Sequence, residues 1–151
     1  MARFTESWST TINRPAAEVY DYLADPTTHG KWSPKAYRVE DLQGPIGAVG
    51  SSFTSVGWVP KDAEHRNRVV LTKAVAGREI EFTSEDGGDK FINRFTLAAS
   101  GSGTTVTRSA DWPKPGGFLG AVFPLVATFL IGPDVRKGLG NLKANLESGR
   151  N

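Results

Sequence analysis

The sequence predicts an α+β fold: one curved antiparallel sheet of about six or seven strands wraps a long C-terminal helix, and two short helices follow the first strand. Three observations predict this order. Alternating polar and apolar residues open the chain, short segments separated by glycine- and proline-rich turns fill its middle, and a helical pattern closes it. A length of 151 residues fits one domain.

The chain begins with a predicted half-buried strand over residues 4–12, where apolar residues alternate with serine and threonine. The proline at position 15 suits the first turn of a short helix over 15–24. Pro26 ends that helix, because the residue before a proline is pushed out of the helical region. A second short helix or turn is expected over 27–32.

The middle of the chain reads as a run of strands. Gly, Pro and Asp mark the turns between them, and connections this short pair consecutive strands in antiparallel fashion. The predicted strands are 37–42, 51–59, 66–75, 78–84, 90–98 and 104–112. Both sides of the strand 66–75 carry apolar residues, so the sequence leaves its inward face undecided.

The C-terminal part is helical and has two halves of different character. Residues 118–130 are apolar nearly all round, which predicts burial on more than one side. Gly132-Pro133 predicts a kink or a break between two helical pieces. The segment 134–148 is amphipathic, with a stripe formed by Val135, Leu139, Leu142 and Leu146.

Composition excludes several classes of protein. The absence of cysteine excludes disulfides, thiolate catalysis and cysteine-bound metals. The net charge is only +2, and no lysine and arginine cluster is dense enough for a nucleic-acid surface. No apolar leader is visible at the N-terminus, and the apolar run 118–132 contains Pro124 and is shorter than the roughly 20 residues that span a bilayer. We expect a soluble cytoplasmic protein with no nucleic-acid partner and no stable membrane insertion.

Three local motifs resemble those of a known family. Residues 12–26 contain a strand end, a Pro-x-x-Glu-Val helix and an Asp-Pro pair, and Trp32 follows six residues later. The hairpin 95–106 and the ending 139–147 complete the likeness, which covers nearly the whole chain. The sequence resembles the SRPBCC superfamily, also called START-like or polyketide cyclase/dehydrase-like proteins. This resemblance implies one helix-grip domain over 1–151 that binds ligands, with a hydrophobic cavity between the concave face of the sheet and the long helix.

The resemblance and the alternation along the strands select candidate cavity residues. The expected ligand-binding residues are Trp8, Phe53, Trp58, Phe82, Asn93, Phe95, Arg108, Trp112, Phe123, Val126, Phe129 and Leu130. Phe53 and Trp58 differ in parity, so both face inward only if a bulge intervenes, and Gly57 permits one. The alternative is that these side chains fill a solid core.

Three polar residues are candidates for a catalytic role: Glu6, Arg108 and Tyr37. An inward Arg108 would orient a ligand carboxylate or carbonyl group, whereas an outward one would cover the sheet with its aliphatic stem. Glu6 shares the parity of Trp8, so an inward Glu6 would act as an acid or base, whereas the alternative is an exposed edge residue or a partner of Arg108. His29 and His65 are expected on surface loops, and since neither belongs to a metal-binding pattern, no metal and no cofactor are expected.

Three functions stay open at this point, because this fold hosts several. The first is the binding of a small hydrophobic ligand, such as a lipid, polyketide or isoprenoid-like molecule, for carriage or sensing. The second is a polyketide cyclase/dehydratase-type enzyme, which needs an acid–base pair within reach of a bound carbonyl group. The third is an interaction protein or homodimer that uses the apolar helix over 118–130.

Overall fold

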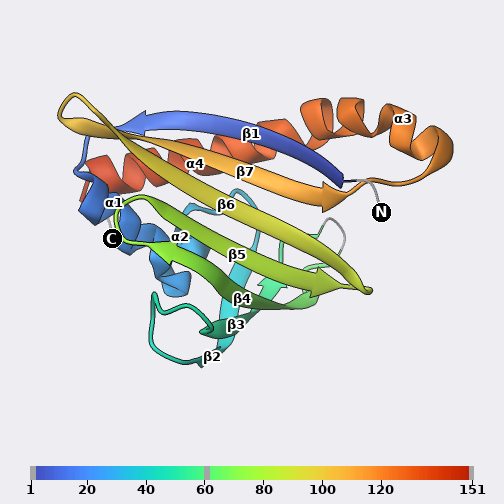
Figure 1. The fold of residues 1–151 in the computed structure, drawn as a ribbon, viewed down its shortest axis with the longest axis horizontal. Coiled ribbons are helices and arrows are strands. Elements are labelled where there is room, and N and C mark those ends of the chain that lie inside the picture. The colour runs from blue at the N-terminus through green and yellow to red at the C-terminus, as the bar shows by residue number, and fades with distance from the viewer. Residues whose placement is uncertain (1–2, 60–61, 150–151) are drawn as a thin grey trace.

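Seven antiparallel strands form one curved sheet in the order β1-β7-β6-β5-β4-β3-β2 (Figure 1). The computed structural model describes residues 3–59 and 62–149. The strands are β1 (Arg3–Ile12), β2 (Tyr37–Gln43), β3 (Ser52–Gly57), β4 (Arg66–Val75), β5 (Glu79–Asp86), β6 (Asp89–Ser100) and β7 (Gly103–Pro113). All six neighbouring pairs are antiparallel. The short connections predict the five pairs of consecutive strands from β2 to β7, whereas the pairing of β1 with β7 joins strands far apart in the sequence. The predicted fold class is confirmed.

The third strand ends earlier than the sequence predicts, at Gly57 instead of Val59. Gly57 has a φ of 108° and Trp58 a φ of 73°, so the chain leaves the extended conformation at this point. A Cβ atom on Gly57 would lie 2.3 Å from the carbonyl oxygen of Ala36, which only glycine avoids. Of the predicted turn that follows, Pro60 and Lys61 lie outside the described residues.

Two short helices follow the first strand, as predicted. They are α1 (Ala16–Ala24) and α2 (His29–Trp32), with a 3₁₀ turn at Pro26–Thr28 between them. The Asp25 carboxylate accepts a hydrogen bond from the Thr27 backbone N–H at 2.9 Å and so caps that turn. Because α2 contacts both β2 and α4, it covers part of the concave face of the sheet.

The C-terminal helix runs without a break through α3 (Gly117–Val126), a π-helical turn (Ala127–Ile131) and α4 (Gly132–Glu147). The alternative of a break at Gly132-Pro133 is wrong, because the helix continues through Pro133 into α4. The irregularity is the π-helical turn just before it. The predicted stripe of α4 is buried and consists of Val135, Leu139, Leu142 and Leu146.

The prediction that residues 118–130 are buried is wrong. The exposed fractions are 79% for Phe118, 66% for Leu119, 60% for Leu125, 36% for Val126, 70% for Phe129 and 68% for Leu130. In Figure 1, α3 extends past the end of β1 and β7, so most of its circumference has no sheet to pack against. An all-round apolar helix is buried only where neighbours surround it, and α3 has them on one side.

The helix also continues through Pro124, contrary to the expected interruption. By length and composition alone, the helix from Gly117 to Glu147 is able to cross a membrane, although 22% of its most apolar window is buried in the protein.

Candidate functional site

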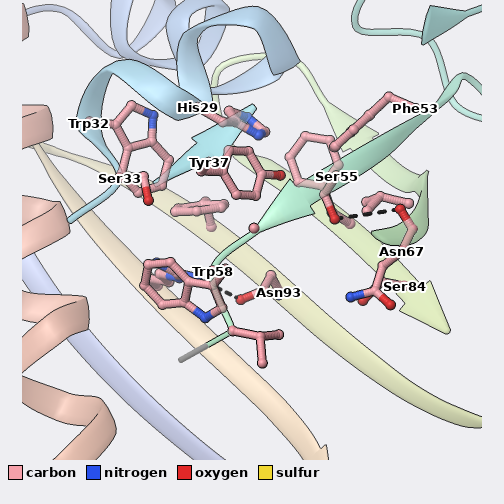
Figure 2. Close-up of a pocket in the computed structure, with 16 residues that line it drawn as sticks. His29, Trp32, Ser33, Tyr37, Phe53, Ser55, Trp58, Asn67, Ser84 and Asn93 are labelled. Carbon is pink, nitrogen blue, oxygen red and sulfur yellow. Dashed lines mark hydrogen bonds between the residues drawn. The ribbon is translucent and has the colours of Figure 1, made fainter. Parts of the chain in front are cut away.

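A cavity of about 160 Å³ lies on the concave face of the sheet beneath α2 (Figure 2). Its walls come from α2, the segment that follows it, and strands β2 to β7. The lining residues are His29, Trp32, Ser33, Tyr37, Phe53, Ser55, Gly57, Trp58, Val59, Asn67, Val69, Phe82, Ser84, Asn93, Phe95 and Arg108. The hollow is therefore largely aromatic and carries a few polar groups.

Half of the predicted ligand-binding residues line this cavity. They are Phe53, Trp58, Phe82, Asn93, Phe95 and Arg108, and the catalytic candidate Tyr37 joins them. Figure 2 shows Trp32, Tyr37, Phe53, Trp58 and Asn93 around the same space. The strand alternation that selected these positions also places their side chains on the concave face.

Phe53 and Trp58 both face the cavity because the chain turns at Gly57, as the bulge hypothesis required. The Trp58 N–H donates to the Ala36 carbonyl oxygen at 3.0 Å and the Gly57 N–H donates to that of His65 at 2.9 Å. These bonds hold Trp58 at a positive φ that a bulky residue adopts only under strain. The Trp58 ring thereby becomes a wall of the cavity.

Arg108 points inward from β7, so the outward alternative is excluded. Its Nη2 donates to the Asn93 Oδ1 on β6 at 3.1 Å. The guanidinium carbon lies 5.6 Å from the ring centre of Phe95, 5.8 Å from Trp32 and 6.0 Å from Trp58. A cationic group thus sits among three aromatic rings at the cavity wall.

Burial is the main perturbation on Arg108 and lowers its pKa to about 10, so the guanidinium still carries its charge at neutral pH. Removing such a cation from water costs several kcal/mol. The hydrogen bond to Asn93 returns about 1.5–3 kcal/mol, and each ring about 0.5–2 kcal/mol at the far end of cation–π range. These contacts make the cation tolerable, but they do not neutralise it.

Three buried side-chain polar atoms lack a hydrogen-bond partner among the described residues, and all three belong to residues that line the cavity. They are the Trp32 Nε1, the Asn67 Oδ1 and the Arg108 Nε. Buried polar groups without partners are rare in proteins, and each one needs an explanation. The unpartnered polar atoms are thus concentrated in side chains around one hollow.

His29 lies in the cavity wall with 9% of its surface exposed, which corrects the prediction of a surface loop residue. Its Nε2 donates to the Leu23 carbonyl oxygen at 2.9 Å, and its ring packs edge-on against Phe82 with centres 5.2 Å apart. Burial lowers the pKa of His29 to about 4, so the imidazole is neutral at pH 7. The sequence misled because a histidine beside a glycine looks like a loop residue, whereas α2 turns it toward the sheet.

Tyr37 is a neutral hydroxyl in the same wall. Burial raises the pKa of its phenol to about 12, because the phenolate is disfavoured away from water. Together, Tyr37 and His29 offer hydrogen bonds but no charge at neutral pH. The cavity therefore combines one permanent cation with neutral polar groups.

The other half of the predicted set lies elsewhere. Trp112 and Phe123 line a separate open groove of about 800 Å³ between α3 and the ends of β6 and β7. Their rings meet edge-on at 6.0 Å. Trp8 is 6% exposed and packs in the core beside Trp112. Three residues are exposed and line neither hollow: Val126 at the end of α3, and Phe129 and Leu130 in the π-helical turn.

Glu6 is half-buried on β1 opposite Ala110, and it lines neither hollow. Within the described residues, no ion pair joins it to Arg108. The structure thus brings Arg108 and Tyr37 together but leaves Glu6 apart from them.

His65 sits outside the cavity, where its ring bridges two carboxylates. Its Nε2 lies 2.7 Å from Asp86 and its Nδ1 lies 3.4 Å from Asp62. These contacts raise the pKa of His65, the Asp86 hydrogen bond most of all. In residues 3–59 and 62–149, no group of three His, Asp or Glu side chains has the arrangement of a metal site.

Several lining residues escaped the sequence analysis. Ser55 and Ser84 stand two positions beyond Phe53 and Phe82 on the same faces of β3 and β5, so parity alone was enough to find them. Asn67 was hidden by the ambiguous pattern of β4. Trp32 was noticed only as a motif residue, because its inward position depends on how α2 packs.

The curved sheet around a C-terminal helix, with a hollow on the concave face, defines a helix-grip domain. Residues 1–147 match the family described as polyketide cyclase / dehydrase and lipid transport. The chain belongs to this family, and the predicted resemblance is confirmed. No curated protein sequence matches the chain.

Several solved structures share this fold at low sequence identity. A norcoclaurine synthase from Thalictrum flavum, solved with a transition-state analogue, has a TM-score of 0.72 and 14% identity over 99% of this chain and 98% of that one. Ara h 8.0201 has a TM-score of 0.70 and 13% identity over 97% and 99% of the two chains. The di-domain ARO/CYC protein BexL has a TM-score of 0.74 and 18% identity, over 96% of this chain and 50% of the BexL chain. At these identities the likeness shows the fold alone.

Proposed function

We propose that this protein binds a small hydrophobic ligand in the cavity beneath α2, for carriage or sensing. The observation that supports this most is the aromatic hollow of about 160 Å³ whose lining holds the unpartnered polar atoms. An engineered apolar cavity of about 150 Å³ holds one benzene. The buried part of the ligand is therefore about one ring in size, and a longer lipid, polyketide or isoprenoid would extend through the mouth.

Family membership fits this proposal but does not separate it from an acid–base enzyme, because the family description names lipid transport beside cyclase and dehydrase activity. The electrostatics of the cavity favour binding. In the cavity, the two groups able to exchange protons have pKa values of about 4 and about 12, far from the operating range of a general acid or base near neutral pH. We keep a cytoplasmic location as part of the proposal, which cell fractionation tests.

The test is ligand binding located by NMR. Native mass spectrometry of freshly purified protein should show a co-purified apolar molecule, and added toluene should shift the resonances of Ser55, Asn67 and Asn93. Ser84→Phe fills the cavity and should weaken toluene binding at least about tenfold, since no space remains for the ring. Ser9→Phe adds the same ring on the exposed face of β1 and should leave binding unchanged. Shifts confined to the α3 groove, or none, would refute the proposal.

A second candidate function is self-association through α3. It is favoured by the six exposed apolar side chains between Phe118 and Leu130, since soluble monomers rarely expose so contiguous an apolar surface. A homodimer would bury these side chains without involving the cavity, so this function is compatible with the first.

A further inference from the structure

The charge inside the cavity is unbalanced. Arg108 is the only Lys, Arg, Asp or Glu among the residues that line it, as far as the structure describes the chain. Its guanidinium has several N–H groups, of which one donates to Asn93 and the buried Nε donates to nothing. The other ionisable groups in the lining, His29 and Tyr37, are neutral. The fold thus encloses a cation and supplies no anion for it.

Water would satisfy the N–H groups of Arg108 but would not neutralise its charge. The aromatic neighbours also fall short, because the rings of Phe95, Trp32 and Trp58 lie 5.6–6.0 Å from the guanidinium carbon. That is the outer limit of a favourable cation–π contact. A buried cation is ordinarily paired with a carboxylate. Elsewhere on the sheet even a partly exposed arginine is paired: Arg94 contacts Glu79 and Glu81.

The surroundings of Arg108 fix the rest of the ligand. Phe53, Phe82 and Phe95 form apolar walls, and the volume of about 160 Å³ admits about one ring. A free inorganic anion would leave this apolar surface uncovered, whereas a neutral hydrocarbon would leave the charge unpaired. A small organic anion with an apolar body satisfies both.

We propose that the cavity binds a small apolar carboxylate, with its anionic group on the Arg108 guanidinium and its body among the aromatic rings. This inference rests on the proposed function, and it narrows the class of ligand from hydrophobic molecules in general to amphipathic acids. Charge-assisted hydrogen bonds are about twice as strong as neutral ones, and guanidinium matches a carboxylate in geometry. Arg108 therefore selects the ligand class, and the rings select its size.

The experiment compares two probes of nearly equal size, benzoate and benzamide, by isothermal titration calorimetry at pH 7. The wild-type protein should bind benzoate at least about tenfold more tightly than benzamide. Arg108→Gln keeps hydrogen-bond donors but removes the charge, so the preference should fall below about threefold while benzamide still binds. Arg78→Gln removes the same charge from an exposed turn and should keep the full preference.

A second variant tests the proposal without deleting Arg108. Asn93→Asp places a carboxylate at the position whose oxygen already lies 3.1 Å from the Arg108 Nη2. This internal anion should weaken benzoate at least about tenfold more than it weakens benzamide, and it should raise the melting temperature, because the cation is then paired inside the protein. Circular dichroism verifies that each variant is folded.

The outcomes separate this inference from the proposed function. Two results would overturn the proposal of a carboxylate ligand and leave the proposal of cavity binding intact. One is equal affinity of the wild type for benzoate and benzamide, and the other is a preference for benzoate that survives both Arg108→Gln and Asn93→Asp. If neither probe binds and toluene causes no shifts at the cavity, both proposals fail together.

Discussion

The concave face of the sheet has two ends, and both carry aromatic side chains. Under α2 the rings of Phe53, Phe82 and Phe95 are at most 5% exposed and line a hollow that also holds the Arg108 side chain. Under α3 the groove stays open, and Phe129 in the adjoining π-helical turn is 70% exposed. Apolar composition alone therefore does not produce a core. Apolar side chains are buried only where a second element packs over them, and here the sheet ends before α3 does.

The largest expected effect comes from making the same substitution at the two ends. Phe82→Ala should lower the free energy of unfolding by about 3–5 kcal/mol, because it removes a buried ring and enlarges the cavity. Phe129→Ala should change it by less than about 0.5 kcal/mol, because that ring already contacts water. Urea denaturation with a constant m-value measures both. Equal losses would show that α3 is covered in solution and would remove the contrast.

The second prediction concerns the pH dependence of the free energy of unfolding, to which His29 in α2 contributes. The folded pKa of His29 is about 4 and the unfolded value is 6.5, so the unfolded chain binds the proton first as pH falls. The stability that His29 contributes is complete above pH 6.5 and is lost between pH 6.5 and 4, to a total on the order of 3 kcal/mol.

To isolate this pH effect, the free energies of unfolding of the wild type and of His29→Gln are compared across the same pH range by urea denaturation. His65 acts with the opposite sign, since its pKa is raised and its contribution is lost as pH rises through the folded value. Both proteins should therefore carry His65→Gln. A pH slope that is the same with and without His29 would show that the ring is hydrated in solution.

The smallest effect on stability, but a clear effect on association, is expected at α3. If the wild type self-associates through the proposed surface, the double variant Phe118→Ser and Phe129→Ser should sediment as a monomer at the same concentrations, because it removes two exposed rings of that surface. Its free energy of unfolding per chain should shift by less than about 1 kcal/mol. A wild-type protein that sediments as a monomer over the whole concentration range would rule out α3 as a self-association surface.

The cavity residues were predictable to different degrees, and the reasons are physical. Strand parity placed Phe82, Asn93 and Phe95 correctly, because side chains alternate strictly across a sheet. Parity left Arg108 undecided, since either face accepts an arginine. It failed for His29, because a four-residue helix has too little pattern to show which side it buries.

The sequence by itself determined the order of the elements along the chain, the antiparallel pairing of consecutive strands from β2 to β7 and the buried stripe of α4, because these follow from local periodicity and short connections. Only the tertiary structure decided which apolar segments are covered, since coverage depends on where the sheet ends and where α2 lands. It also decided that Arg108 has no anionic partner. Pairing between distant side chains is a property of the packed chain, and no local pattern carries it.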